Sequence, residues 1–299
     1  MSTMIALVGE QPIPVLLPVR ALKPNLVALM HTGDTRLVAE RIKRLINTQV
    51  DLLEVEPFDV RDCQRVLKRY LKHAPGPVIY NLTGGTKTML LAAYMVALTN
   101  RSSVVYLQTQ GATSRLYSYR VGSSGLVEIE ARELPALINA DDYLKAHLPG
   151  FTLDGFSREG KSLTSGGLFE KAVHDALLRG RIDEVLPGVK PDGVAKNIDI
   201  DLFVRCGNQA GIAEIKLNKA GKAGLDQLAT AGGREYLGIY TAKFLIVGNI
   251  IGDGLKELAQ ARGIKIIELP SYAINKQLSL VDEKVLTESV RGKLGVKPT

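Results

Sequence analysis

The chain has 299 residues, of which 45% are hydrophobic and 23% are charged, and it carries a net charge of +7. This composition is ordinary for a soluble globular protein long enough for two domains, each with its own core. No apolar run reaches membrane-spanning length and the start lacks a signal-peptide pattern, so we expect a cytoplasmic protein with no membrane partner. The two cysteines, Cys63 and Cys206, have no zinc-binding spacing, which predicts free thiols. The positive charge is compatible with a polyanionic partner.

The first half of the chain alternates short apolar segments with helical patterns. This βαβ rhythm predicts a parallel sheet with helices on both faces. Ligands of such sheets bind beyond the carboxyl ends of the strands. The predicted strands cover residues 4–8, 26–30, 51–56, 78–80 and 104–107, and the predicted helices cover 12–22, 34–46, 60–72 and 88–98.

A glycine-containing loop, Asn81-Leu82-Thr83-Gly84-Gly85-Thr86-Lys87, follows the fourth predicted strand. Its two glycines let the backbone approach an anion, and the helix after them offers free N–H groups and a positive dipole end. Thr83 and Thr86 add hydroxyls, and Lys87 adds a charge. The alternative is a tight strand-to-helix turn with a capping threonine. The spacing is not that of a P-loop, and no GxGxxG follows the first strand, which argues against NAD or FAD.

The middle of the chain connects the two halves. Residues 113–119 and 126–130 predict two antiparallel strands, which either extend the sheet or mediate dimer contacts, and residues 140–147 predict a short helix. Residues 149–165 are rich in glycine and serine and predict a linker. We therefore expect domains at residues 1–148 and 166–299, joined by a linker at 149–165.

Charged side chains interrupt two predicted strands of the second half, Ile198–Phe203 and Ala213–Leu217. Alternation along a strand places Asp199 and Asp201 on one face of the first, and Glu214 and Lys216 on one face of the second. Charges are normally kept out of buried strands, because removing them from water is costly. Two carboxylates and an ammonium are suited to holding Mg²⁺ or Mn²⁺ and a water molecule. The alternative is an edge hairpin with solvated charges.

The second half resembles the PD-(D/E)xK nuclease core, the fold of restriction endonucleases. The resemblance rests on Asp201, Glu214 and Lys216, on Glu170 in a preceding predicted helix, and on the helix and strand predicted after them at 225–234 and 242–247. It implies that Asp201 and Glu214 bind the metal, that Glu170 contributes directly or through water, and that Lys216 positions the attacking water or stabilises charge on the phosphate. Asp199 remains an alternative to Asp201. His174, one helical turn after Glu170, fits a packing role better than a metal ligand.

The first half resembles CARF domains, the CRISPR-associated Rossmann fold. The resemblance rests on the loop from Asn81 to Lys87 and on the segment 7–14, which includes Glu10, Gln11 and Pro12. The whole chain is then an α/β protein, with a Rossmann-like CARF domain on a parallel sheet and a restriction-endonuclease-like α/β domain. His31 and residues 108–110 also lie at ligand-facing strand ends, with a capping or polar-loop role as the alternative.

The combined resemblance implies a cyclic-oligoadenylate-activated nuclease of type III CRISPR defence. It implies a homodimer whose CARF domains form one pocket, cyclic tetra-adenylate as the activator, and metal-dependent cleavage of DNA, RNA or both. The residues carried over as ligand contacts are Glu10, Gln11, Pro12, Asn81, Thr83, Gly84, Gly85, Thr86 and Lys87. Two rival interpretations remain open: a non-catalytic regulator that binds nucleic acid, and a CARF domain that degrades its own ligand. The nucleic-acid preference, the ring size of the activator and the preferred metal also stay open.

Overall fold

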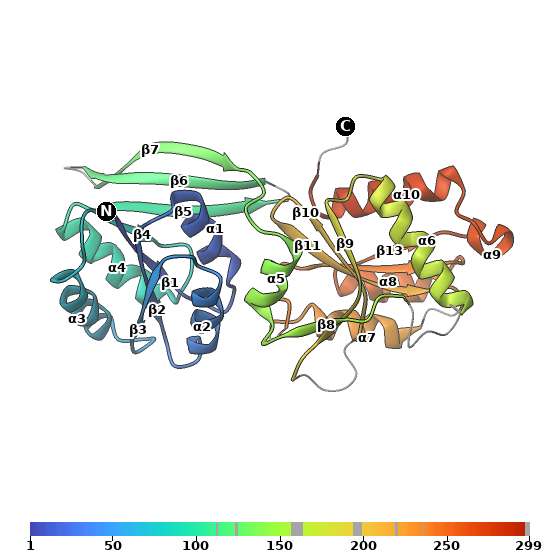
Figure 1. Cartoon of the computed structure of the whole chain (residues 1–299), viewed down its shortest axis with the longest axis horizontal. Coiled ribbons are helices and arrows are strands. Elements are labelled where there is room, and N and C mark those ends of the chain that lie inside the picture. Colours follow the sequence, from blue (N-terminus) through green and yellow to red (C-terminus); the bar gives the residue numbers. More distant parts are fainter. Residues whose placement is uncertain are drawn as a thin grey trace. The chain divides into compact units, whose positions relative to one another are not determined.

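The computed structural model describes residues 1–111, 113–122, 125–156, 164–193, 199–218, 221–234 and 236–296. The chain divides into two compact units, Met1–Leu137 and Ile138–Thr299, each built on a sheet of its own (Figure 1). Within the described ranges, no helix is both long and apolar enough to cross a bilayer.

The first unit is organised around a seven-stranded sheet with the order β3-β2-β1-β4-β5-β6-β7. The predicted parallel sheet is confirmed for the first five strands, and the predicted hairpin extends it in antiparallel fashion. The chain order reverses at β1, which lies between β2 and β4, so the strand ends there form the expected ligand-binding edge. The strands are β1 (Thr3–Leu7), β2 (Leu26–His31), β3 (Gln49–Glu54), β4 (Val78–Asn81), β5 (Ser103–Gln110), β6 (Thr113–Gly122) and β7 (Gly125–Leu134).

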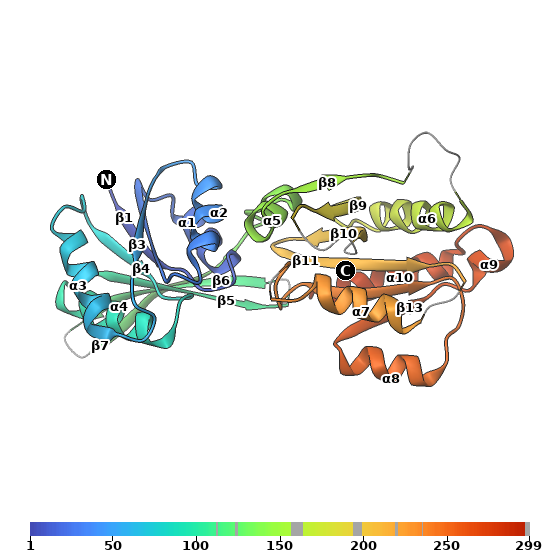
Figure 2. The same ribbon diagram turned by 90° about the horizontal axis from the view of Figure 1, so that it is seen from below.

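Helices cover both faces of this sheet because the central strands are apolar on both sides. Met4 and Ala6 of β1 pack in a cluster with α1 (Ile13–Leu22) and α2 (Arg36–Arg44). Ile5 and Leu7 of the same strand point the other way, into a cluster with α3 and α4. These two helices span Val60–Leu71 and Lys87–Thr99 and lie side by side (Figures 1 and 2).

The second unit contains a mixed six-stranded sheet with the order β13-β12-β11-β10-β9-β8. The strands from β8 to β11 are antiparallel, whereas β11, β12 and β13 are parallel. The strands are β8 (Phe151–Leu153), β9 (Glu184–Pro191), β10 (Ile200–Cys206), β11 (Gln209–Lys216), β12 (Ala242–Val247) and β13 (Ile264–Glu268); the helices are α5 (Ala140–His147), α6 (Ser165–Arg179), α7 (Lys222–Ala231), α8 (Asp253–Ala261), α9 (Ser271–Asn275) and α10 (Leu280–Lys293).

The two faces of β10 serve different purposes. Leu202 and Val204 belong to the main core of the unit, together with Phe169 of α6 and Leu286 of α10. Phe203 points to the opposite face, where its ring lies 5.7 Å from that of Tyr143 in α5. The same alternation places Asp201 on the face of Phe203, away from the main core.

The unit boundary lies between Leu137 and Ile138, ahead of the linker predicted at 149–165. The helix that we assigned to the first domain belongs to the second unit, because Tyr143 contacts Phe203 and its hydroxyl lies 3.0 Å from that of Thr241. The predicted linker also contains a strand, since β8 pairs with β9. Part of that linker, residues 157–163, lies outside the described residues.

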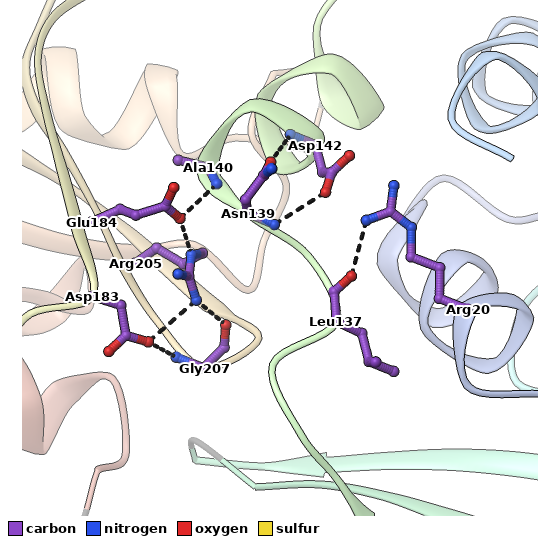
Figure 3. A network of polar contacts seen from close by, with 9 residues as sticks. All are labelled: Arg20, Leu137, Asn139, Ala140, Asp142, Asp183, Glu184, Arg205 and Gly207. Atoms are coloured by element: carbon purple, nitrogen blue, oxygen red, sulfur yellow. Dashed lines mark hydrogen bonds and ion pairs between the residues drawn. The ribbon is translucent and has the colours of Figure 1, made fainter. Parts of the chain in front are cut away.

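A charge network around the largely buried Arg205 fixes the start of α5 within the second unit (Figure 3). The guanidinium of Arg205, which is largely buried, donates to Glu184, to Asp183 at 3.2 Å and to the carbonyl oxygen of Gly207. Glu184 also accepts a hydrogen bond of 2.8 Å from the N–H of Ala140, the first residue of α5. Because each buried charge has partners, the network avoids the large penalty of an unpaired ion.

Candidate active site and ligand-binding loop

Asp201, Glu214 and Lys216 converge at the end of the central hairpin of the second unit. Strands β10 and β11 pair with Leu202 opposite Ala213, so Asp201 and Glu214 come next in register. The Nζ of Lys216 lies 2.6 Å from Oε1 of Glu214 and 3.8 Å from Oδ2 of Asp201. The same Oδ2 accepts a 2.7 Å hydrogen bond from the N–H of Ile215. The period-2 prediction for Asp201, Glu214 and Lys216 therefore matches the structure.

Glu214 is a buried carboxyl group in a negatively charged surrounding. Its side chain is only 3% exposed. Burial, and then the charge of Asp201, raise the pKa of Glu214 to about 7, although Lys216 opposes this rise. Helix α7 accounts for the burial, because a Cβ at Gly224 would lie 3.5 Å from Cγ of Glu214. A cation placed here would remove the repulsion between the two carboxylates.

Lys216 stays charged in this environment. Burial lowers the pKa of its ammonium, but the carboxylates of Asp201, Glu214 and Glu170 outweigh burial and the net shift is upward. An ammonium that keeps its proton donates hydrogen bonds and stabilises negative charge, and it does not accept a proton from water. This favours an orienting or charge-stabilising role over that of a general base.

Glu170 and Asp199 lie in the electrostatic neighbourhood of this site. The charge of Glu170, on α6, contributes to the raised pKa of Lys216, and the charge of Asp199 contributes to the raised pKa of Glu214. Asp199 precedes β10, and its carbonyl oxygen accepts a hydrogen bond from the side chain of Gln227 in α7. Among the described residues, no group of three or more histidine, cysteine or acidic side chains is arranged to hold a metal ion. A preformed set of three carboxylates is therefore not seen among the described residues, and the charge of Glu170 reaches the site through its effect on the pKa of Lys216.

His174 has other partners, as we expected of a packing residue. Its ring lies 5.0 Å from the ring of Phe156 in an edge contact, and its Nδ1 is 2.9 Å from Oδ1 of Asp175.

In the first unit, Asn81 and Thr83 hold the glycine-containing loop in place. Asn81 is fully buried; its Nδ2 donates to the carbonyl oxygen of Pro14 at 3.0 Å, and its Oδ1 accepts from the N–H and the hydroxyl of Thr83. The Thr83 hydroxyl oxygen in turn accepts a 2.8 Å hydrogen bond from the N–H of Leu107 in β5. Both side chains use these atoms within the protein, so they position the loop.

Gly84 and Gly85 are required by the packing of the loop. A Cβ on Gly84 would collide with the carbonyl oxygen of Leu7, and Gly85 adopts a φ of +76°, which favours glycine. In the described part of the chain, the N–H groups of Gly84, Gly85 and Lys87 have no hydrogen-bond acceptor. They are available to an anion at the N-terminus of α4, where the exposed Lys87 adds a positive charge.

Thr86 is the N-cap of α4, which confirms the capping interpretation for this residue. Its hydroxyl oxygen accepts a 3.1 Å hydrogen bond from the N–H of Met89 and donates a 2.9 Å bond to the carbonyl oxygen of Pro57. The second bond fixes the β3–α3 connection beside the loop. Phe58, the residue that follows Pro57, is 83% exposed. We did not select Phe58 from the sequence; an aromatic residue just after a predicted strand was the available signal.

The loop after β1 packs against the glycines. A Cβ on Gly9 would lie 3.1 Å from the backbone nitrogen of Gly85, so Glu10, Gln11 and Pro12 lie near the loop that we selected. Pro12 is buried at the start of α1, and Glu10 is exposed. The Nε2 of Gln11 is a buried donor with no acceptor among the described residues. A buried unsatisfied donor is costly, which is consistent with a ligand atom as its partner.

Two further predicted contacts have partners of their own. His31 is buried, and its Nδ1 lies 2.9 Å from the carbonyl oxygen of Thr32. Oε1 of Gln108 accepts a 3.0 Å hydrogen bond from the hydroxyl of Tyr117. These contacts favour the alternative interpretation, in which both are structural residues.

Comparison with known families bears directly on this loop. Residues 3–129 match the family model of the Card1 CARF domain. This region is similar to CARF domains. The match contains the glycine-containing loop and the segment with Gln11, so the CARF resemblance is confirmed. A comparison with curated proteins gives no match.

Solved structures share the fold of this chain over both units. Can2 from Sulfobacillus thermosulfidooxidans, in complex with cyclic tetra-adenylate, superimposes with a TM-score of 0.75 at 16% identity, over 99% of this chain and 100% of that chain. VC1899 from Vibrio cholerae also gives a TM-score of 0.75, at 12% identity and 99% coverage of both chains. A type III CRISPR defence DNA nuclease activated by cyclic oligoadenylate gives 0.59 at 18% identity, over 84% of this chain and 46% of that chain. At these identities the likeness establishes the fold.

Proposed function

We propose that this CARF protein is a metal-dependent nuclease of type III CRISPR defence, activated by a cyclic oligoadenylate and acting on DNA, RNA or both. The observation that carries the proposal is the convergence of Asp201, Glu214 and Lys216 on a mixed sheet. The solved relatives support it, because one is bound to cyclic tetra-adenylate and another is a DNA nuclease. We propose cyclic tetra-adenylate as the activator and a homodimer as the active form.

The residues present fit a hard divalent cation. Asp201 and Glu214 would hold it, because Mg²⁺ is commonly bound by one or two carboxylates while water and substrate phosphate complete its shell. A bound Mg²⁺ or Mn²⁺ supplies an activated water molecule and neutralises charge on the phosphate. Glu170 is proposed to act through a water molecule. Lys216 donates to the water or to a phosphate oxygen, since its ammonium keeps its proton.

The test is a cleavage assay on labelled DNA and RNA, single- and double-stranded, with and without cyclic tetra-adenylate. We expect cutting with Mg²⁺ or Mn²⁺ plus the activator, and none with EDTA. Light scattering would report the expected dimer. A chain that binds nucleic acid but cuts no substrate with either metal would be a regulator, and loss of the activator during incubation would identify ligand degradation.

We predict that the stability of the metal-free protein falls as the pH rises from about 4.5 to about 7, in a way that depends on Glu214. The unfolded chain ionises this carboxyl near its ordinary pKa of 4.5, whereas the folded protein keeps the proton until about 7. Between these values the folded state binds more protons, so raising the pH favours unfolding, and the loss is complete above 7. Urea unfolding of wild type and Glu214→Gln would measure it.

The difference in unfolding free energy between the two proteins should change across this window. Mn²⁺ added above pH 7 should restore the stability of the wild type alone, because it binds only the folded carboxylate site. Parallel pH profiles for the two proteins would contradict this environment for Glu214.

Phe58→Ala should weaken binding of cyclic tetra-adenylate by about tenfold, whereas Phe58→Trp should bind as tightly as wild type. Stacking of an aromatic ring on a base contributes about 1–3 kcal/mol per base. Leu37→Ala is the matched control, because Leu37 is also a large exposed apolar residue of this unit. Titration calorimetry would measure all four proteins, and equal affinity of Phe58→Ala and wild type would exclude the stacking role.

A further inference from the structure

The exposed side of α3 carries a run of basic side chains that the proposed catalytic and ligand sites do not use. The opposite side of this helix is buried through Cys63, Val66 and Leu67. The basic side chains are all exposed and line an open groove with Gln64. We name this surface the α3 basic stripe; it consists of Arg61, Arg65, Lys68, Arg69 and Lys72.

Acidic neighbours compensate little of this charge. Asp59 uses its carboxylate to cap α3, accepting from the N–H groups of Arg61 and Asp62. Asp62 accepts a 3.0 Å hydrogen bond from the N–H of Glu56. This bond is the main reason why the pKa of Asp62 lies below its ordinary value, and the contact of Asp62 with Arg65 lowers it further. Asp62 is the acidic residue within the helix range, so five basic groups less one carboxylate leave a charge of +4 between Val60 and Lys72.

This arrangement is unfavourable for the isolated helix. Basic residues follow each other at a spacing of four in three pairs, namely 61 and 65, 65 and 69, and 68 and 72. Like charges at this spacing face each other on a helix and destabilise it by a few tenths of a kcal/mol per pair. A polyanion bound along the stripe would attract all five basic side chains and so offset the repulsion between them.

We propose that the α3 basic stripe binds the phosphate backbone of a nucleic acid. At 1.5 Å per residue, the eleven steps from Arg61 to Lys72 extend about 16 Å, which matches about five phosphates of one strand of a duplex. Three of the five residues are arginines, whose guanidinium groups match phosphate geometry. A membrane surface fits less well, because the apolar face of α3 is buried in the domain core and is not available to enter a bilayer.

The stripe lies on the CARF unit, so it adds a nucleic-acid contact separate from the proposed catalytic residues. Phosphate contacts of this kind position a strand without reading its sequence. The stripe therefore sets the affinity for long substrates and the salt dependence of binding, while the rate of cutting at saturation depends on the catalytic residues.

The test compares two variants of the full chain. In the stripe variant, the five residues of the stripe are changed to glutamine. In the control variant, five other exposed basic residues of the same unit are changed to glutamine, namely Lys43, Arg44, Arg101, Arg115 and Arg120. Fluorescence anisotropy with labelled duplex DNA and single-stranded RNA, in EDTA to prevent cutting, would give the affinity at salt concentrations from about 50 to about 200 mM.

We expect the stripe variant to bind at least about tenfold more weakly than the control variant at the lowest salt concentration. Each lost phosphate contact reduces the slope of log affinity against log salt by about 0.7–0.9, so the slope should decrease by two or more. The stripe variant should melt no lower than the control variant, because its substitutions remove the like-charge pairs of α3. Cyclic tetra-adenylate binding should be the same in both variants. Equal affinities and slopes for the two variants would overturn the proposal, and so would stripe-dependent binding to phosphatidylserine vesicles without binding to nucleic acid.

Discussion

Glu214→Gln and Lys216→Ala should each reduce metal-dependent cutting by at least about a hundredfold, with the fold and activator binding unchanged. Glutamine keeps the shape of the buried side chain and removes the charge that a hard cation needs. Lys216→Ala removes the ammonium that lies 2.6 Å from Glu214, and with it a positive group aimed at the charge that develops on the phosphate. Single-turnover cleavage at saturating metal and activator would measure both losses.

The matched control is a lysine–carboxylate pair outside the proposed site. Lys145 and Asp141 of α5 form an exposed ion pair of 2.8 Å, so Lys145→Ala and Asp141→Asn should cut as wild type does. Asp201→Asn should be far more damaging than Asp199→Asn, because Asp201 is the carboxylate that lies beside Lys216. Wild-type rates for Glu214→Gln, or loss in Asp199→Asn with normal cutting by Asp201→Asn, would contradict the assignment.

The convergence of Asp201, Glu214 and Lys216 was predictable because it depends on local periodicity. Side chains two residues apart share a face of a strand, so the positions of Glu214 and Lys216 follow from the sequence once the strand is recognised. The pairing with Asp201 follows from a short hairpin turn between consecutive strands. The burial of Glu214 could not be predicted, because it depends on how closely α7 approaches at Gly224.

Strand β9 was missed because its local sequence resembles a turn. It contains Pro187 and Pro191, and Gly188 within it has a φ of +64°. Proline and glycine normally indicate a break in a strand, and the pairing of this segment with β10 and β8 is what makes it a strand. We predicted no helix or strand after residue 250, although α8, β13, α9 and α10 form there.

The domain boundary and the roles in the loop depended on tertiary contacts. The pattern at 140–147 predicted the helix with its bounds. The unit to which this helix belongs is decided by its contacts with Phe203 and Glu184, which lie far along the chain. Likewise, the motif identified Asn81 without showing that its amide is used by Pro14 and Thr83. Sequence thus predicts which residues matter in this loop better than it predicts whether they contact a ligand or hold the backbone.

Lys87→Ala should raise the concentration of cyclic tetra-adenylate needed for half-maximal cutting by about tenfold or more, with the maximal rate unchanged. The exposed Lys87 lies at the N-terminus of α4, beside the N–H groups of Gly84 and Gly85, which have no acceptor among the described residues. A hydrogen bond to a charged phosphate contributes about 1.5–3 kcal/mol. Lys43→Ala, at an exposed lysine of α2, is the control and should respond as wild type does.

Thr86 calls for a different comparison, because its hydroxyl caps α4 and holds Pro57. Loss of an N-cap costs about 1 kcal/mol of helix stability, so Thr86→Ala weakens the fold of the loop as well as binding, whereas Thr86→Ser keeps the hydroxyl and should behave as wild type.

An activator works only by binding the cutting-competent state more tightly than the resting state, and a hundredfold activation requires about 2.7 kcal/mol of such differential binding. Calorimetry that showed undiminished binding of cyclic tetra-adenylate by Lys87→Ala would remove this loop as the sensor. Equal cutting with and without every cyclic oligoadenylate tested would instead contradict activation itself, even if the loop binds the ligand.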